Sequence, residues 1–226
     1  MSIADTGSSG LARVLTPTLR KQCWGFMIGS ALFALGSAPG FGQWAGASAS
    51  NLAYFVGAWF FTAAGLIQLL MSGARTVPVA YGTGTMVRAE WLTAASQSLG
   101  TVLFNVSTTA AIAAHSVPAE RHLVWSPDAG GSIAFLVSGA VAYVAYYRAN
   151  GTNWAPRDSG WWSVQINWVG CVAFAVSAVG AYVTRTGVTV DTVVANVGTF
   201  IGALCFFFAS LVVLPRRSSA GVGAGS

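Results

Sequence analysis

Six apolar stretches follow one another along the chain, separated by short segments that are richer in polar and turn-forming residues. The stretches lie near residues 22–40, 51–72, 91–114, 128–148, 161–184 and 192–214. A helix needs about 20 mostly apolar residues to cross a bilayer, and these stretches meet or approach that length. No Asp, Glu, Lys or Arg lies well inside any of them. The pattern therefore predicts an all-α protein with six transmembrane helices.

Composition supports this prediction and excludes other classes of protein. The 226 residues include only 11 Lys and Arg and 6 Asp and Glu, which together make 8% of the chain. Soluble domains average about 25% charged residues, so this chain lacks the charges that would cover a soluble surface. Its net charge of +5 comes from few cations without a continuous basic face, so we expect no nucleic-acid partner. The three cysteines all lie in apolar stretches and do not indicate a disulfide framework.

The Lys and Arg residues are divided unequally between the two sides of the predicted bundle. Nine would lie on the side of the termini: Arg13, Arg20, Lys21, Arg75, Arg88, Arg148, Arg157, Arg216 and Arg217. Only Arg121 and Arg185 would lie on the other side. Short loops rich in Lys and Arg stay in the cytoplasm, so both termini are expected there. This predicts a membrane domain over 22–214 between two cytoplasmic tails, residues 1–21 with a basic interfacial segment and residues 215–226 without order.

The first stretch also has features of a cleaved signal peptide. Lys21 precedes its apolar run, and Ala47-Ser48-Ala49 follows it as a possible cleavage site. We expect this stretch to be retained as a membrane span, because it shares a repeated pattern with the other five.

The repeated pattern is a Gly, a Phe four residues later and a small residue three positions after the Phe. Its eighteen positions are Gly29, Phe33, Gly36, Gly57, Phe61, Ala64, Gly100, Phe104, Ser107, Gly131, Phe135, Ser138, Gly170, Phe174, Ser177, Gly202, Phe206 and Ala209. The copies in the first, third and fifth stretches are 71 and 70 residues apart. We therefore expect three related helical hairpins, near 22–72, 91–148 and 161–214.

The three positions of each copy fall on one helix face. Helices in lipid associate through close packing of small and large side chains, so the pattern is expected to form helix–helix contacts. A groove between hairpins that holds a lipid or another ligand is the alternative interpretation. The predicted fold class is thus an all-α, polytopic transmembrane bundle of six helices, built from three related hairpins, with both termini inside.

Uncharged polar residues in the third and fifth stretches form the first candidate site. These residues are Gln97, Asn105 and Asn167. Such side chains usually form hydrogen bonds between helices in membranes. The alternative is a polar pocket that binds a neutral solute or a lipid headgroup.

A predicted external loop over 115–130 forms the second candidate site. Its ionisable side chains include His115, Glu120, His122 and Asp128. These residue types can hold a metal ion, but their spacing matches no metal motif, so we predict no metal site. A solvated loop with Asp128 as the N-cap of the fourth helix is the simpler interpretation.

No catalytic or cofactor-binding motif occurs in the sequence, so no cofactor and no catalytic residue is predicted. The single lysine, Lys21, lies outside the apolar stretches, which excludes a retinal Schiff base within the bundle.

Residues 28–39 (Ile-Gly-Ser-Ala-Leu-Phe-Ala-Leu-Gly-Ser-Ala-Pro) and residues 55–68 resemble the YrhK-like hairpin of bacterial membrane proteins. Residues 123–135 are similar to the middle portion of longer, uncharacterised proteins of that kind. The resemblance covers most of 22–214 and is sharpest over 22–70. It implies a location in the bacterial inner membrane, and it implies no activity and no catalytic residues.

Together these patterns predict a non-enzymatic bacterial inner-membrane protein that acts as a scaffold, an accessory subunit or a lipid-interacting component. The expected partners are membrane lipids and either further copies of the chain or another membrane protein. One alternative is a transporter or channel for a small solute or a lipid, with a polar groove between the third and fifth helices. A second alternative is a membrane enzyme that uses the predicted external loop.

Overall fold

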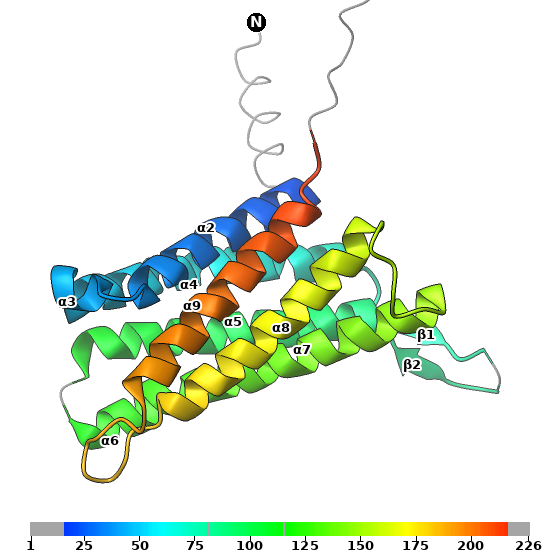
Figure 1. Cartoon of the computed structure of the whole chain (residues 1–226). Helices are drawn as coiled ribbons and strands as arrows, with labels where there is room; N and C mark the ends of the chain where they lie inside the picture. The colour runs from blue at the N-terminus through cyan, green and yellow to red at the C-terminus, as the bar shows by residue number, and fades with distance from the viewer. Residues whose placement is uncertain (1–15, 81, 115, 217–226) are drawn as a thin grey trace, which may run out of the picture.

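A computed structural model describes residues 16–80, 82–114 and 116–216, and nearly all of its regular structure is helical (Figure 1). The six longest helices are α2 (Leu19–Ser37), α4 (Ala47–Met71), α5 (Ala89–Ala113), α7 (Ser126–Asn150), α8 (Ser159–Gly180) and α9 (Thr192–Val212). The shorter helical elements are α3 (Phe41–Ala45), α6 (Val117–Ala119) and a π-helical turn, η1 (Glu120–Trp125). Two strands of three residues, β1 (Thr76–Pro78) and β2 (Thr85–Val87), pair in an antiparallel hairpin. The predicted all-α class is therefore confirmed.

Within the described part of the chain, four helical segments are long and apolar enough to cross a membrane. They are Ala47–Met71, Val117–Asn150, Ser159–Gly180 and Thr192–Val212. The other two long helices, α2 and α5, have sufficient length but are more polar. Much of the polarity of α5 faces inward, because Gln97 and Thr101 are buried. Four candidate spans fit a membrane protein.

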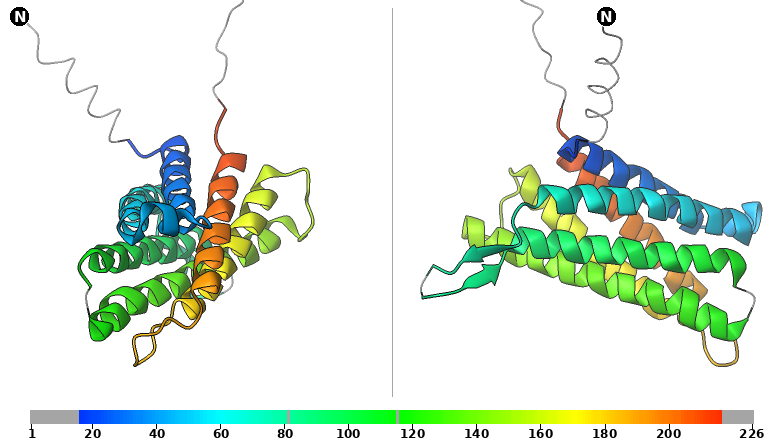
Figure 2. Two further views of the ribbon diagram at one scale, coloured as in Figure 1. Left: turned by 60° about the vertical axis from the view of Figure 1, so that its left-hand side comes forward. Right: turned by 180° about the vertical axis from the view of Figure 1, so that it is seen from behind.

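The six long helices form a closed ring in the order in which they occur in the chain. Each packs against its neighbours in sequence, and the ring closes where α2 packs against α9. The most extensive contacts are those within the pairs α2–α4, α5–α7 and α8–α9. All six run between two ends of the molecule (Figures 1 and 2). We call the end where α2 begins and α9 ends the terminal end, and the end with α3 and α6 the loop end.

The two ends of the bundle differ in how closely the helices approach. Helices α2 and α9 lie side by side at the terminal end and diverge toward the loop end (Figures 1 and 2). The β1–β2 hairpin projects from the terminal end, beyond the helices (Figure 2). The sequence pattern did not predict this hairpin. The divergence leaves the interior more open at the loop end.

Polar caps in the short connections set the ends of several helices. The carboxylates of Asp158 and Asp191 accept hydrogen bonds from the first backbone N–H groups of α8 and α9. The hydroxyl of Thr18 accepts one in the same way at the start of α2. Helix α7 ends at Gly151, whose φ of 66° is a left-handed conformation that favours glycine. These caps keep the connections short, so that consecutive helices become neighbours in the ring.

The segment 115–130, predicted as a solvated loop, is helical from Val117 onward, so that prediction is wrong. The hydroxyl of Ser116 caps the start of the helix, which continues through the π turn into α7. Pro127 has no N–H to donate, and the wider π turn just before it lets the helix continue past this missing donor. Asp128 therefore lies in the first turn of α7 and does not serve as its N-cap.

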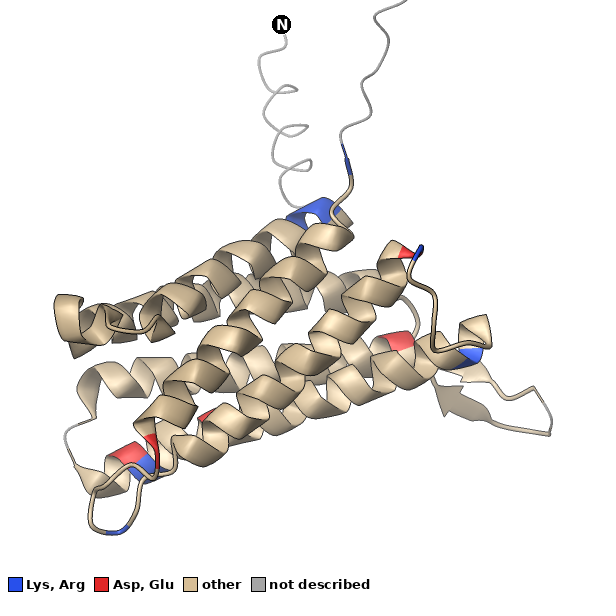
Figure 3. Cartoon of the chain, viewed as in Figure 1, with Lys and Arg blue, Asp and Glu red and all other residues tan. Residues whose placement is uncertain are grey.

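Charged side chains gather at the two ends of the bundle (Figure 3). Among the described residues, the terminal end carries Arg20, Lys21, Arg75, Arg88, Arg148, Arg157 and Arg216. The loop end carries Arg121 and Arg185, while Arg13 and Arg217 fall outside the described residues. The unequal division expected from the sequence is thus a division between the two ends of the folded bundle.

Candidate functional site

Six phenylalanines, one from each long helix, fill the centre of the ring. They are Phe33, Phe61, Phe104, Phe135, Phe174 and Phe206, and none is more than 4% exposed. Within each hairpin the two rings have centroids 5.0–5.2 Å apart. Further ring contacts of 5.3–6.4 Å join the three hairpins. We call these six residues the Phe layer, and its tilted and edge-to-face contacts close the centre of the bundle with apolar rings.

Glycines of the repeated pattern allow these rings to lie against the facing helix. In the α5–α7 pair, a Cβ placed on Gly100 would lie 2.5 Å from Cδ1 of Phe135. In the α8–α9 pair, a Cβ on Gly202 would lie 2.7 Å from Cδ2 of Phe174. Protein interiors do not tolerate contacts this short without movement of the neighbours. Glycine at these positions therefore permits the close approach of the two helices.

All eighteen residues of the repeated pattern are buried. Its serines also bond within the hairpins: the hydroxyl of Ser138 donates to the carbonyl oxygen of Thr93 at 2.9 Å. The hydroxyl of Ser177 donates to the carbonyl oxygen of Ala195 at 2.6 Å. The pattern thus lies on the face that each helix turns toward its partner and the centre of the ring.

A cavity of about 630 Å³, the loop-end cavity, lies between the Phe layer and the loop end. Residues from all six long helices line it, and Phe33 of the Phe layer forms part of its wall. Its polar lining residues include Asn51, Tyr54, Ser107, Thr108, Glu120, Trp125, Asp128, Ser177, Thr192, Asn196 and Thr199. The described lining includes two carboxylates and neither Lys nor Arg. The wall of the cavity therefore combines polar groups with a larger apolar surface, and its ionisable groups are all acidic.

The wall of the loop-end cavity follows the repeat of the hairpins. Three residues before the pattern glycine of the second helix of each hairpin stand Tyr54, Asp128 and Thr199. Six residues before the same glycines stand Asn51, Trp125 and Asn196. These equivalent positions place all three hairpins around one cavity. Unlike the Phe layer, the first set holds a different residue in every hairpin, and the second set holds Asn in two hairpins and Trp in the third.

A smaller cavity of about 200 Å³, the terminal-end cavity, lies between the Phe layer and the terminal end. Residues from all six long helices line it too, together with Phe206 of the Phe layer. Of the predicted polar pocket, Gln97 and Asn167 line this cavity and Asn105 does not. The side-chain amide of Asn105 instead donates a hydrogen bond to the hydroxyl of Thr62 on α4. The structure thus brings two of these three residues together.

The residues predicted as an external-loop site are separated in the structure. Glu120 and Asp128 both line the loop-end cavity. His122 is exposed and does not line it, and His115 lies outside the described residues. Among the residues that the structure describes, no three His, Cys, Asp or Glu side chains are placed to hold a metal ion together. What remains of the predicted site is a pair of carboxylates in one cavity.

Neither carboxylate forms an ion pair with a described residue. The ion pair found in the described part of the chain joins Arg88 and Glu90 at 3.4 Å, at the terminal end. Arg121 follows Glu120 in sequence, but its Nη2 donates to the hydroxyl of Tyr182 at 3.0 Å. Its guanidinium also lies over the Tyr182 ring, 5.7 Å from the centroid. The nearest arginine in sequence is therefore held by an aromatic ring and leaves the acidic charge of the cavity unpaired.

Trp125 and Tyr54 are two aromatic lining residues that the sequence interpretation did not single out. The indole N–H of Trp125 donates to the carbonyl oxygen of Ala178 at 2.8 Å, and its ring packs edge-on against Tyr182 at 4.8 Å. Both side chains occupy positions equivalent to polar residues of the other hairpins. The repeat spacing is the sequence signal that locates them, once the pattern glycines are aligned.

Comparison of the chain with protein-family models, with curated proteins and with solved structures finds no match. Its function is therefore argued from the ring, the Phe layer and the two cavities.

Proposed function

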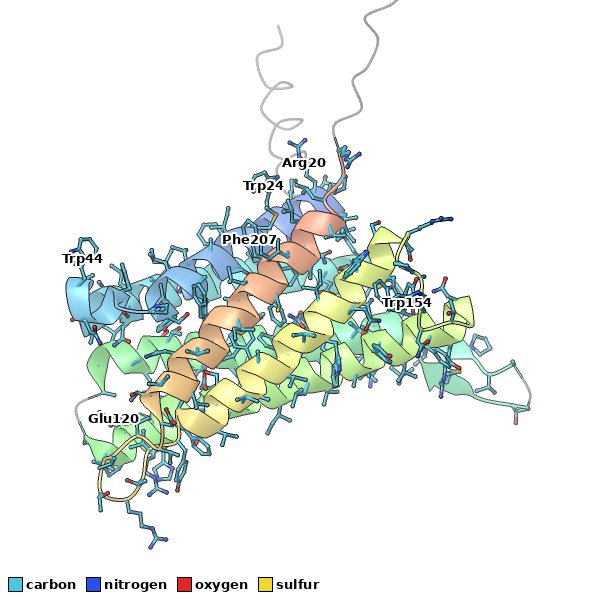
Figure 4. The ribbon with its side chains drawn as sticks, viewed as in Figure 1. Arg20, Trp24, Trp44, Glu120, Trp154 and Phe207 are labelled. Atoms are coloured by element: carbon cyan, nitrogen blue, oxygen red, sulfur yellow. The ribbon has the colours of Figure 1, made fainter. Side chains whose placement is uncertain are left out.

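We propose that this chain is an integral protein of the bacterial inner membrane, in which all six long helices cross the bilayer and the terminal end faces the cytoplasm. The excess of Lys and Arg at the terminal end supports this orientation, since cytoplasmic segments carry such an excess. Trp44 and Trp154 lie at opposite ends of the bundle (Figure 4) and are 85% and 71% exposed. Exposed Trp at both ends fits two membrane interfaces. The resemblance to YrhK-like hairpins supports the bacterial location.

Within this membrane domain, we propose a gated pathway for a small polar solute, in a protein that catalyses no reaction. One observation carries the proposal: a cavity with polar residues in its wall lies on each side of the Phe layer, and all six long helices line both. Phe33 borders one cavity and Phe206 borders the other, and the centroids of six pairs of rings from different hairpins lie within 6.4 Å. A hydrophobic constriction between two wet spaces gates by excluding water. The described conformation is then the closed state.

The scaffold function expected from the repeated pattern receives less support. All eighteen pattern residues are buried inside the bundle, so the pattern is used for internal packing. It leaves no equivalent surface for a partner protein. Internal packing also gives no reason for the carboxylates of Asp128 and Glu120, which form no ion pair with a described residue, because such groups are costly to bury without partners. A polar solute gives such a reason.

Cysteine accessibility in native membranes tests the pathway in the full chain. In a background without the native cysteines, Thr199→Cys places a thiol in the loop-end cavity and Ser210→Cys places one in the terminal-end cavity. The matched control is Ile201→Cys on the same helix, at a position that is 44% exposed and lines neither cavity. The measurement is the rate of modification by a membrane-impermeant methanethiosulfonate added to one side.

We expect Thr199→Cys to react only from outside and Ser210→Cys only from the cytoplasmic side. Ile201→Cys is expected to react from neither side, because a thiol in lipid does not ionise to the reactive thiolate. The opposite sidedness for both cavity positions would overturn the orientation and leave the pathway intact. If neither cavity position reacts from either side, the cavities are dry and the pathway is overturned.

A further inference from the structure

The loop-end cavity has a carboxyl group that belongs to one of the apolar helical segments. Asp128 belongs to the apolar helical segment Val117–Asn150 and contributes to the wall of the cavity. Ionisable residues within membrane spans are rare, and they face cavities or partners and mark the paths of ions and substrates. Asp128 accepts no hydrogen bond from a described residue and forms no ion pair with one. The carboxylate is therefore available to a ligand in the cavity.

The repeat shows that the ring does not require this charge for its packing. The positions equivalent to Asp128 in the other two hairpins hold Tyr54 and Thr199, which are uncharged. All three side chains line the same cavity, so the ring is built with or without a carboxylate at this level. Glu120, which lies earlier on the same continuous helix at the start of the π turn, adds a second acidic group to the same wall. Because packing does not need these carboxyl groups, we infer that they bind a ligand in the cavity.

Aromatic rings stand beside the two carboxylates. Trp125 lines the cavity between Glu120 and Asp128 in sequence, and Tyr54 lines it from α4. The hydrogen bond from the Trp125 indole to Ala178, at 2.8 Å, fixes the ring in place. Aromatic faces attract organic cations, and sites for quaternary ammonium groups combine such rings with negative charge. Carboxylates and aromatic rings in one cavity are the chemistry that recognises an ammonium group.

We propose that the loop-end cavity binds a small organic ammonium group, with Asp128 and Glu120 supplying the charge and Trp125 and Tyr54 the aromatic wall. The volume of about 630 Å³ lies within the range of about 300–1,000 Å³ that small-molecule sites occupy. The inference rests on the proposed pathway and names the class of solute that enters it from the loop end.

The ammonium group has two sources, a free amine in solution and the headgroup of an aminophospholipid. A neighbouring cavity of about 560 Å³ shares five lining residues with the loop-end cavity, among them Asn51 and Thr192. It is lined by α2, α3, α4 and α9, where α2 and α9 diverge. Ser50 lines it too, is only 9% exposed and has a hydroxyl without a hydrogen-bond partner in the described part of the chain. We expect a free amine to enter from the aqueous side and an aminophospholipid headgroup to enter through this neighbouring cavity.

Calorimetry on the purified full chain in detergent tests whether a free amine binds in the cavity. The probes are choline, ethanolamine and 3,3-dimethyl-1-butanol, the last being a neutral molecule with the shape of choline. We expect the wild type to bind one or both of the amines and not the neutral analogue. Asp128→Asn removes the charge with little change of shape, and it is expected to weaken amine binding roughly tenfold or more. Glu120→Gln serves as a second variant should Asp128→Asn fail to fold.

Glu90→Gln is the matched control, because Glu90 lies at the terminal end and pairs with Arg88 at 3.4 Å. It removes one carboxylate from the chain without touching the cavity, and binding is expected to remain as in the wild type. Equal weakening in Glu90→Gln and Asp128→Asn would show a general effect of net charge and overturn the site.

Lipid binding forms the second arm. Native mass spectrometry of the wild type with phosphatidylethanolamine or phosphatidylglycerol measures which lipid stays bound, and Asp128→Asn is compared with Glu90→Gln. Selective retention of phosphatidylethanolamine that Asp128→Asn abolishes, with weak binding of free amines, identifies the lipid headgroup as the source. Tight binding of free amines identifies the soluble source.

The inference is overturned if Asp128→Asn and Glu120→Gln, folded as judged by their melting curves, bind both amines and both lipids as the wild type does. It is also overturned if the wild type binds neither the amines nor phosphatidylethanolamine selectively. Cysteine accessibility separates these failures from a failure of the pathway itself. A reactive Thr199→Cys together with no ammonium binding would retain the pathway and reject the ammonium site.

Discussion

The Phe layer and the loop-end cavity are neighbouring levels of one ring, and they use the three hairpins in different ways. In the Phe layer every hairpin supplies the same residue type from both of its helices. In the cavity the equivalent positions hold Tyr54, Asp128 and Thr199. Close packing is satisfied by repeating one complementary shape, whereas recognition of a ligand needs different groups around it. In this molecule, the departure from the repeat coincides with the proposed ligand site.

The largest effect is expected from opening the Phe layer. Phe135 is fully buried and has ring contacts with Phe104 at 5.0 Å and with Phe206 at 5.3 Å. Phe135→Ala leaves a cavity among these rings and is expected to lower the free energy of unfolding by about 3–5 kcal/mol. Denaturant titration of the purified protein in detergent measures it. Phe208→Ala is the control, because Phe208 is 47% exposed, and equal losses in both variants would contradict a central role of the layer.

A smaller effect is expected from disturbing the fit of a ring against its glycine. Gly100→Ala puts a methyl group against the Phe135 ring and is expected to cost about 1–3 kcal/mol through overpacking. The same titration applies. Gly130→Ala is the matched control, because its nearest neighbour would be Cδ1 of Leu103 at 3.4 Å, an ordinary contact. Similar stability of the two variants would show that the helices of the α5–α7 pair separate easily, against the close packing described for them.

The smallest effect comes from a carboxylate that, unlike Asp128, has its partners within the protein. The hydroxyl of Tyr146 donates to Asp158 at 2.6 Å, and the backbone N–H groups of Gly160 and Trp161 also donate to it. The Tyr146 hydrogen bond first, and then the Gly160 N–H, lower the pKa of Asp158 below its ordinary value. Because the folded-state pKa is the lower one, the stabilisation is present above the unfolded pKa of about 3.9 and is lost as pH falls toward the folded pKa.

We therefore expect the melting temperature of the wild type to fall more steeply below pH 4 than that of Asp158→Asn, with a small difference because Asp158 is exposed. Melting curves in detergent between about pH 5 and pH 3 measure the slopes. Parallel slopes would show that the hydrogen bonds of Asp158 do not stabilise the folded state over the unfolded one.

The helical class follows directly from the apolar stretches, and the long helices lie within a few residues of the predicted ones. The exception is the segment Val117–Trp125 before α7, where charged residues indicated a loop and the structure is helical. Ser116 caps a helix there, and a π turn carries it past the proline. Such a start depends on local backbone geometry that hydrophobic periodicity does not encode. The β1–β2 hairpin has too few residues to show a pattern.

The candidate site, like the fold, could be predicted from the sequence only in part. The six phenylalanines of the layer stand out in the sequence, because one spacing recurs in every stretch. The cavity wall is assembled from residues such as Asn51, Trp125 and Asn196, which are about 70 residues apart and become neighbours only in the closed ring. Gln97 and Asn167 lie together and Asn105 does not, because its amide is bonded to Thr62 on the adjacent helix. The partner of such an amide depends on how its helix is rotated about its own axis. The composition of an apolar stretch does not determine that rotation.

Because α2 packs against α9, the ring is closed, and the first and last hairpins have a neighbouring hairpin on each flank, as the middle hairpin does. A circular permutant that joins the two helices at the terminal end, and opens the chain between Asn150 and Ser159, keeps every interface between the long helices. In the same way, a hairpin expressed alone presents on its two flanks the surfaces that its neighbours occupy in the full chain. The interfaces between the three hairpins are therefore of the kind that could equally join three separate chains, each about one third as long.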